Sequence, residues 1–355
     1  MIFHYLKIAF RNLCKHKTQN IISIIGLAVG LLCFCVCIYC SRFVESTDHC
    51  FANHDRIAEL NLYDGKADRY FSGSPVPLAE ELRTWALGET EAISSVTYPR
   101  ERPYYVELSP EKTLPYELET IEIDTCYNKI FTPEMVAGHW KMASQSLNSV
   151  ILSQSMAIKI FGNAESAIGK HMTLMRRLNT SPESTPKTGG IVYIIQAVMK
   201  DIPLNNSLDF MQNIDMLTVN DSEGLLQSPK RHNMTGANTY VLLSPQTTCT
   251  DLEKQFSKRD YTYTLYDEAY TVTASNMGSR LKKQGASYLE LVTGTVGTLI
   301  LLVGLINFFH FLIGSFFNRT KEYSIMKMIG CNWKQLFCLL FTQSLIVISI
   351  SSIFI

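Results

Sequence analysis

The chain has 355 residues, of which 46% are hydrophobic and 18% charged, and its 32 basic and 32 acidic side chains give a formal net charge of zero. This composition excludes a disordered tail, which would be poor in apolar residues, and a nucleic-acid-binding protein, which would be basic. Three segments, residues 21–40, 291–317 and 336–355, contain no Asp, Glu, Lys or Arg. Each is about long enough to cross ~30 Å of hydrocarbon, so the sequence predicts an integral membrane protein.

The N-terminal residues 1–20 carry four Lys or Arg side chains and no acidic one. Lys7, Arg11 and Lys15 stand four residues apart on a different face from the apolar side chains, which favours a cytoplasmic amphipathic helix on the inner membrane surface. An ordinary cytoplasmic packing helix is the alternative. Residues 21–40 are predicted to be transmembrane helix 1, because this apolar run is too long for the core of a signal peptide. Gly26 and Gly30 give this helix a small-xxx-small packing face.

The large region 41–287 holds 24 basic and 30 acidic side chains, a net charge of −6. The segments before the first apolar run and between the other two are basic, so both are expected in the cytoplasm and region 41–287 outside it. Strand-like and helix-like runs alternate in this region, which indicates an α+β domain. The strand-like runs are 92–98, 118–123, 148–152 and 191–198, and the helix-like ones are 77–86 and 154–161. Residues 179–190 are turn formers and predict a loop.

The C-terminal part of the chain predicts two further membrane helices. Residues 288–317 are predicted to be transmembrane helix 2, in which Gly297 and Gly304 lie near one face and favour close helix packing. Residues 318–335 form a short cationic connection, and residues 336–355 are predicted to be transmembrane helix 3. The fold class is therefore an α-helical membrane protein with three transmembrane helices and a large α+β extracytoplasmic domain.

No enzyme motif is complete in this sequence. The nearest match to the phosphate-binding pattern G-x-x-x-x-G-K-[ST] has six residues between Gly162 and Gly169, and His171 stands where a hydroxyl should ligate magnesium. The polar cluster at residues 48–55 matches no standard metal site, and a polar helix next to the membrane explains it better. We therefore predict no catalytic, cofactor-binding or metal site, and no enzyme activity in this chain.

Three stretches carry a family resemblance. The first is residues 5–60, with YLKIAFRNLCKHKTQNIISIIGLAVGL at 5–31 and FANHDRIAEL at 51–60. The second is the pair VILSQSMAIKIFGNAESAIGKHM at 150–172 and YIIQAVMKDIPLNNSLDF at 193–210, and the third is NRTKEYSIMKMIGCNWKQLF at 318–337. Together they resemble the FtsX-like, MacB-type family of ABC transporter permeases, in the form common in Bacteroidetes. The resemblance implies a MacB-type periplasmic domain at 41–287, where Gly162 and Gly169 would be structural turn positions. Since family members have four spans, the chain is expected to be truncated before the fourth transmembrane helix.

The resemblance also implies a role for the third stretch. In relatives, the segment that corresponds to residues 318–335 is a cytoplasmic coupling helix that docks on the ATPase subunit. The implied contact residues are Arg319, Lys321, Glu322, Ile325, Met326, Lys327 and Gly330. A generic positive-inside loop is the alternative, but a loop needs no apolar periodicity such as that of Ile325 and Ile329.

These observations predict a permease subunit in the bacterial inner membrane, with its N-terminus in the cytoplasm and its large domain in the periplasm. The expected partners are an ABC ATPase subunit that binds the ATP, a second permease copy or half, membrane lipid, and a periplasmic adaptor or outer-membrane component. The subunit would transmit ATP-driven motion to the periplasmic domain for efflux or extraction of a substrate. The alternative is a membrane-anchored sensor or scaffold that works without an ATPase.

Overall fold

The structure is a computed structural model, and it describes residues 17–71, 73–109, 112–174, 190–209, 212–222, 224–227, 235–265, 267–279, 287–317 and 320–353. The chain divides into two compact units. One unit comprises Met1–Glu45 and Gln284–Ile355, and the other comprises Ser46–Lys283. Most of the predicted amphipathic helix, residues 1–16, lies outside the described residues, and so does nearly all of the predicted loop 179–190.

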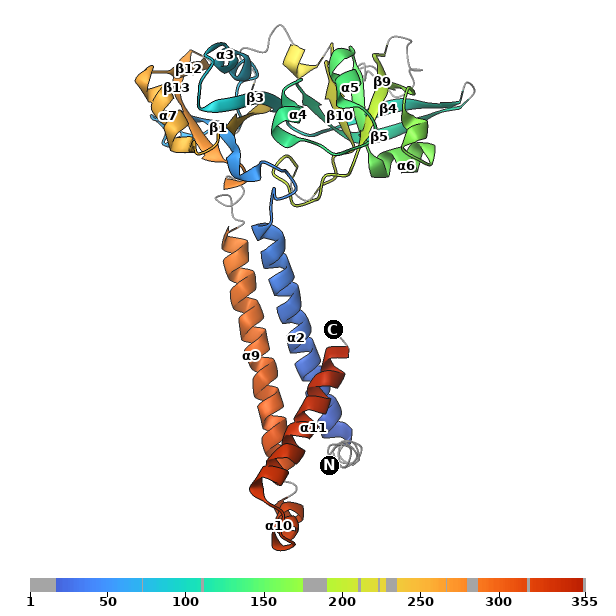
Figure 1. Ribbon diagram of the computed structural model, residues 1–355, viewed down its shortest axis with the longest axis vertical. Coiled ribbons are helices and arrows are strands. Elements are labelled where there is room, and N and C mark those ends of the chain that lie inside the picture. Colours follow the sequence, from blue (N-terminus) through green and yellow to red (C-terminus); the bar gives the residue numbers. More distant parts are fainter. Residues whose placement is uncertain are drawn as a thin grey trace. The chain divides into compact units, whose positions relative to one another are not determined.

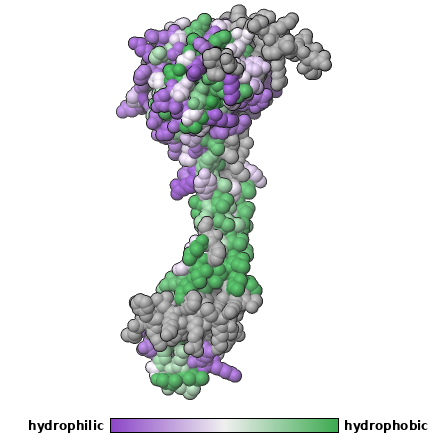
Figure 2. Space-filling view, turned by 90° about the vertical axis from the view of Figure 1, so that its right-hand side faces the viewer, coloured by the Kyte–Doolittle hydropathy of each residue, from purple (hydrophilic) through white to green (hydrophobic). Residues whose placement is uncertain are grey.

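The first unit is helical (Figure 1). Its described helices are α2 (Lys17–Glu45), α9 (Ser287–Phe317), α10 (Thr320–Met328) and α11 (Trp333–Ile353). Three segments in it, Ile21–Glu45, Leu291–Gly314 and Trp333–Ile353, are long and apolar enough to cross a membrane. Their surface is predominantly apolar, unlike the mixed surface of the other unit (Figure 2). The three predicted membrane helices are thus present, and the protein is a membrane protein.

Half of the second unit is a closed barrel of six strands, here called the barrel lobe. Its strands are β4 (Arg100–Ser109), β5 (Lys112–Ile123), β7 (Ser149–Ser153), β8 (His171–Leu174), β9 (Val192–Met199) and β10 (Met216–Val219). They follow the order β10-β7-β9-β8-β4-β5, and a parallel pairing of β10 with β5 closes the ring. All six strands contribute to one cluster of buried side chains, which includes Tyr104, Leu118 and Tyr193. This cluster is the barrel interior, and α6 (Gln154–Phe161) packs against it.

The other half is an antiparallel sheet covered by two helices, here called the antiparallel lobe. Its strands run in the order β3 (Thr90–Thr97), β11 (Ala237–Leu243), β1 (Ile57–Asp64), β13 (Glu268–Asn276) and β12 (Thr262–Leu265), and its helices are α3 (Leu78–Thr84) and α7 (Cys249–Lys258). The short strand β2 (Arg69–Tyr70) pairs with β1, and β6 (Met135–Gly138) pairs with β9 of the barrel lobe. A third core, with α4 (Tyr127–Phe131) and α5 (Trp140–Gln145) beside it, contains side chains from both lobes.

The predicted fold class is confirmed. Strands β3, β5, β7 and β9 and helices α3 and α6 occupy the positions of the strand-like and helix-like runs, and α6 has the predicted bounds 154–161. The predicted turn positions are also present, because Gly162 (φ +87°) caps the C-terminus of α6 and Gly169 (φ +77°) donates its N–H to the Ile195 carbonyl. Some helix bounds differ from the prediction: α2 spans Lys17–Glu45 rather than 21–40, α10 ends at Met328, and α11 begins at Trp333 rather than at residue 336.

Candidate functional site

The segment between α9 and α11 is a folded helical hairpin rather than an open loop. In α10, Tyr323 is buried and forms a small core with Leu336 and Leu339 of α11. The Tyr323 ring also stacks on Phe316 of α9, with the ring centroids 5.6 Å apart. Met326 is half-buried against the same core. Apolar side chains on one face of α10 therefore attach it to the adjoining helices α9 and α11.

A defined turn connects α10 to α11. Gly330, at φ +97°, donates its N–H to the Lys327 carbonyl at 3.1 Å, and Cys331 donates to the Met326 carbonyl at 3.0 Å. This pair of bonds is a Schellman motif, in which glycine takes the left-handed position at low cost. Asn332 then precedes α11, and its N–H donates to the side-chain oxygen of Gln335 at 3.0 Å. Both helix ends at the turn are thus capped, which fixes the direction of the hairpin.

The remaining face of α10 and the turn are exposed. Lys321 and Glu322 are exposed near the start of α10, and Ile325 is 52% exposed. The Lys327 ammonium lies 4.4 Å from the centroid of the Trp333 ring, a cation–π contact. Three large apolar side chains extend this surface: Met328, Ile329 and Trp333 are 80%, 82% and 64% exposed. We call residues 321, 322, 325, 327–329 and 333 the hairpin surface.

The structure places the predicted contact residues in three different environments. Lys321, Glu322, Ile325 and Lys327 lie on the hairpin surface, whereas Met326 packs inward and Gly330 forms the turn. Arg319 lies outside the described residues. The predicted list omitted Met328 and Trp333. The signal that could have found Met328 is the helical spacing of 325, 328 and 329 opposite the inward-facing Tyr323 and Met326, whereas Trp333 begins the next helix and is not part of this pattern.

The four predicted packing glycines lie where α2 and α9 contact one another. A Cβ atom on Gly30 would lie 3.3 Å from the Gly304 Cα, so the two backbones are in van der Waals contact there. A Cβ atom on Gly297 would come within 2.6 Å of the Cys37 Cβ, and one on Gly26 would overlap the side-chain amide of Asn307. A Cβ atom on Gly26 or Gly297 would thus overlap a neighbour, and one on Gly30 or Gly304 would already touch the opposite backbone, which leaves no space there for a long side chain. Such close approach lets backbone and side-chain dispersion hold two membrane helices together.

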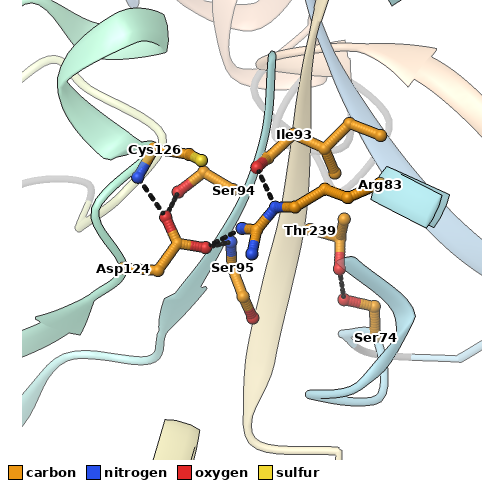
Figure 3. Close-up of polar contacts among 8 residues, drawn as sticks. All are labelled: Ser74, Arg83, Ile93, Ser94, Ser95, Asp124, Cys126 and Thr239. Carbon is orange, nitrogen blue, oxygen red and sulfur yellow. Dashed lines mark hydrogen bonds and ion pairs between the residues drawn. The ribbon is translucent and has the colours of Figure 1, made fainter. Parts of the chain in front are cut away.

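In the second unit, the carboxylate of Asp124 takes part in a structural hydrogen-bond network. Asp124 follows β5 and accepts hydrogen bonds from the Arg83 guanidinium, the Ser94 hydroxyl and the backbone N–H groups of Ser95 and Cys126 (Figure 3). Arg83 also donates to the Ile93 carbonyl at 2.9 Å. This network joins α3, β3 and the segment after β5. Within the described ranges, no group of three or more His, Cys, Asp or Glu side chains is arranged to hold a metal ion.

A second buried carboxylate lies near the end of β5. Glu122 is 3% exposed, and its two oxygens accept hydrogen bonds from the N–H groups of Leu225 and Leu226 at 2.7 and 2.9 Å. Burial raises the pKa of Glu122 to about 7, an effect that the nearby Asp221 increases and that these two hydrogen bonds and Arg102 oppose. The carboxyl thus titrates near neutral pH in the folded protein.

This raised pKa predicts a pH-dependent stability. Because the folded state binds the Glu122 proton more tightly than the unfolded state, the contribution is complete below pH ~4.5 and is lost as the pH rises through about 7. Between pH 5 and 8 the free energy of unfolding should fall by up to about 3 kcal/mol from this group. Thermal unfolding in detergent across this range tests it. Glu122→Gln should flatten the pH profile, whereas Glu117→Gln, at an exposed position of β5, should leave the profile of the wild type.

Comparison with known proteins gives one family match, which covers residues 294–354 and is described as "FtsX-like permease C-terminal". No curated protein matches the chain. Among solved structures, similarity extends to a domain assigned to a permease protein from Porphyromonas gingivalis, with 20% identity, a TM-score of 0.47, and 64% of this chain and 93% of that chain covered.

Two further solved structures are similar over a comparable part of the chain. The periplasmic region of MacB from Actinobacillus actinomycetemcomitans is 13% identical, with a TM-score of 0.41, and covers 66% of this chain and 94% of its own. The extracellular domain of the noncanonic ABC-type transporter YknZ from Gram-positive bacteria is 13% identical, with a TM-score of 0.35. The match covers 62% of this chain and 100% of that chain. Since every one of these TM-scores is below 0.5, the assignment rests on the family match. The similarity to this family is therefore limited to residues 294–354, a segment that includes the hairpin and matches the C-terminal part of FtsX-like permeases.

Proposed function

We propose that the chain is the permease subunit of an ABC transporter and that its hairpin surface is the contact for a separate ATPase. The observation that carries the proposal is that the family match includes α10 and the turn, where exposed apolar and charged side chains lie side by side. Protein interfaces combine these two kinds of side chain, because buried apolar anchors supply affinity and charges at the rim supply specificity.

The charge distribution supports a cytoplasmic position for this hairpin. Lys321, Lys327 and Lys334 are exposed at the ends of two membrane helices, and positive charge is retained on the cytoplasmic side of the membrane. With this orientation the N-terminus is also cytoplasmic and Ser46–Lys283 lies on the outer side, in the periplasm of a Gram-negative cell. ATP would bind in the partner ATPase, since the chain has no complete phosphate-binding motif of its own.

The helix packing suggests how motion would pass through the membrane. Movement of α10 would shift α9, because Tyr323 stacks on Phe316 at the end of that helix. Movement of α9 would shift α2, because the two helices are in backbone contact at Gly30 and Gly304. Both helices continue into the connections to the large domain. The subunit would thereby convert ATP-driven closure of the ATPase into movement of that domain, for efflux or extraction of a substrate, together with a second permease copy.

Replacing Glu322 and Lys327 together with alanine tests the proposed contact. Both side chains are exposed, so the double variant should insert into the membrane like the wild type. Loss of two charged contacts at an interface should reduce the ATPase recovered with the purified chain by roughly tenfold, equivalent to ~1.4 kcal/mol. Quantitative mass spectrometry of the detergent-purified complex measures this ratio.

The matched control is Ser324→Ala, also exposed on α10, whose hydroxyl donates to the Thr320 carbonyl of its own helix. It should retain ATPase recovery. Full recovery with the double variant would argue against the hairpin surface as the contact. A wild-type chain that purifies without any ATPase would instead favour a membrane-anchored sensor or scaffold.

A further inference from the structure

Asp48 lies in the connection between α2 and β1, three residues after the end of α2. Its carboxylate accepts hydrogen bonds from the Ser207 N–H at 2.6 Å and from the Ser207 hydroxyl at 2.5 Å. The Asp48 N–H donates to the Asn205 carbonyl at 2.9 Å. The Asn205 side-chain amide in turn donates to the backbone carbonyl and the hydroxyl of Ser46, at 3.1 and 3.0 Å. Residues 46–48 are therefore tied to residues 205–207 by both backbone and side-chain groups; we call this contact the neck clamp.

The neck clamp attaches the segment that follows α2 to the barrel lobe, although the chain itself continues into the antiparallel lobe. The chain continues from Asp48 into β1, which belongs to the antiparallel lobe. Residues 205–207, in contrast, lie between β9 and β10, two strands of the barrel lobe. The segment that directly follows α2 is thus bonded covalently to one lobe and by hydrogen bonds to the other.

The return connection also lies against the clamp. Met277, just after β13, donates its N–H to the Ile57 carbonyl of β1 at 2.9 Å. The next residue, Gly278, has φ +76°, and a Cβ atom on it would lie 2.7 Å from the Asp48 Oδ2 and 3.3 Å from the Ser207 Oγ. A glycine is required here because any side chain would collide with the clamp. Both connections to the helical unit, and the barrel lobe, therefore meet at Asp48.

Asp48 occupies an unfavourable position for an acidic residue. It is 3% exposed, and burial raises its pKa although the bonds from Ser207 and the nearby His54 and His49 oppose this shift. Its backbone is also left-handed, at φ +68°. A buried carboxylate and a strained backbone at one residue both cost folding free energy. Such strained residues are concentrated at functional sites. The hydrogen bonds of Asp48 to Ser207 and Asn205 run from both its side chain and its backbone, so residues 46–48 and 205–207 are expected to move together.

We propose that Asp48 is a positioning residue that transmits displacement of the periplasmic end of α2 to the barrel lobe through Ser207 and Asn205. The proposal rests on the proposed function, because it requires an ATP-driven movement of the helices. Without the clamp, the movement would reach the antiparallel lobe through the covalent connection to β1, and the barrel lobe would follow less closely.

Hydrogen exchange on the full chain, purified with its ATPase, tests this proposal. Exchange is compared without nucleotide and with Mg-ATP plus vanadate, which arrests the ATPase after hydrolysis. In the wild type, peptides from 46–64 and from 193–209 should both change on trapping. In Asp48→Ala, the change in 46–64 should persist and the change in 193–209 should be lost. Without nucleotide, the Ser207 N–H has no acceptor in Asp48→Ala, and it should exchange about tenfold faster than in the wild type.

Three further variants separate coupling from folding. Asp55→Ala removes a carboxylate of the same connection whose side chain is 88% exposed, and it should behave as the wild type. Asp48→Asn retains an acceptor for the Ser207 N–H and a donor for its hydroxyl, so it should restore the ATP-dependent change in 193–209. If Asp48→Ala does not fold, Ser207→Ala removes one hydrogen bond only and should reduce that change.

Two outcomes would overturn the proposal, and they differ. An unaltered ATP-dependent change at 193–209 in Asp48→Ala or Ser207→Ala would remove the clamp from the transmission path while leaving the permease assignment intact. A wild-type complex that shows no ATP-dependent change anywhere in residues 46–283 would remove the proposed function itself, and the clamp with it.

Discussion

Replacing Asp124 with alanine is expected to lower the free energy of unfolding of the large domain by about 3–5 kcal/mol. The Asp124 side chain is 18% exposed and the Arg83 side chain 32% exposed, so the substitution leaves a half-buried guanidinium without its carboxylate. The Ser94 hydroxyl and the N–H groups of Ser95 and Cys126 lose the same acceptor. A buried donor without an acceptor loses its hydration without compensation, and this penalty makes the effect large.

Thermal unfolding of the detergent-solubilised protein measures this effect, which should lower the melting temperature by roughly 10 °C for a domain of this size. The matched control is Glu117→Ala, which removes an exposed carboxylate from the same strand β5 and should change stability by less than ~0.5 kcal/mol. If Asp124→Ala and Glu117→Ala unfold at the same temperature, the network in Figure 3 contributes little to the fold.

Replacing Gly304 with leucine is expected to separate α2 from α9. A Cβ atom at position 304 would lie 3.4 Å from the Gly30 Cα, so a leucine side chain can fit only if the helix backbones move apart. Overpacking of this kind costs about 3 kcal/mol or more, because the neighbouring groups are backbone atoms that cannot change rotamer. The variant should aggregate or melt at a lower temperature in detergent, as measured by size-exclusion chromatography after heating.

The same helix provides the control for this substitution. Around Gly294, also in α9, no atom of the described residues other than the adjoining backbone of the same helix lies within 4 Å of an added Cβ. Gly294→Leu therefore adds an equal apolar side chain to the same helix without touching α2, and it should retain the wild-type elution profile. Equal behaviour of the two leucine variants would contradict the close α2–α9 packing.

The local elements were predictable from the sequence because their signals are local. The bounds of α6 follow from Ser153, whose hydroxyl accepts from the Met156 N–H at the start, and from Gly162 at the end. Closure of the barrel was not predictable. It depends on the parallel pairing of Met216–Val219 with Thr120–Ile123, strands separated by nearly one hundred residues, and a single sequence carries no signal for such a contact.

The candidate site shows the same limit. The charge asymmetry and apolar spacing of residues 318–335 indicated the segment, since both are properties of neighbouring residues. The direction of each side chain was harder to predict from the sequence. Met326 faces the core of Tyr323 and Leu336, while Met328, two residues later, is 80% exposed. The neck clamp is the extreme case. Asp48 and Ser207 are 159 residues apart and meet only through the arrangement of the whole domain.

The central claim is that this FtsX-like segment couples to an ATPase, and purification of the full-length protein in mild detergent with mass spectrometry of what remains bound tests it most directly. The account predicts an ABC ATPase in near-stoichiometric amount, and its loss when residues 320–330 are replaced by a flexible Gly-Ser segment of equal length. Recovery of the chain without an ATPase, or an ATPase that stays bound after this replacement, would contradict it.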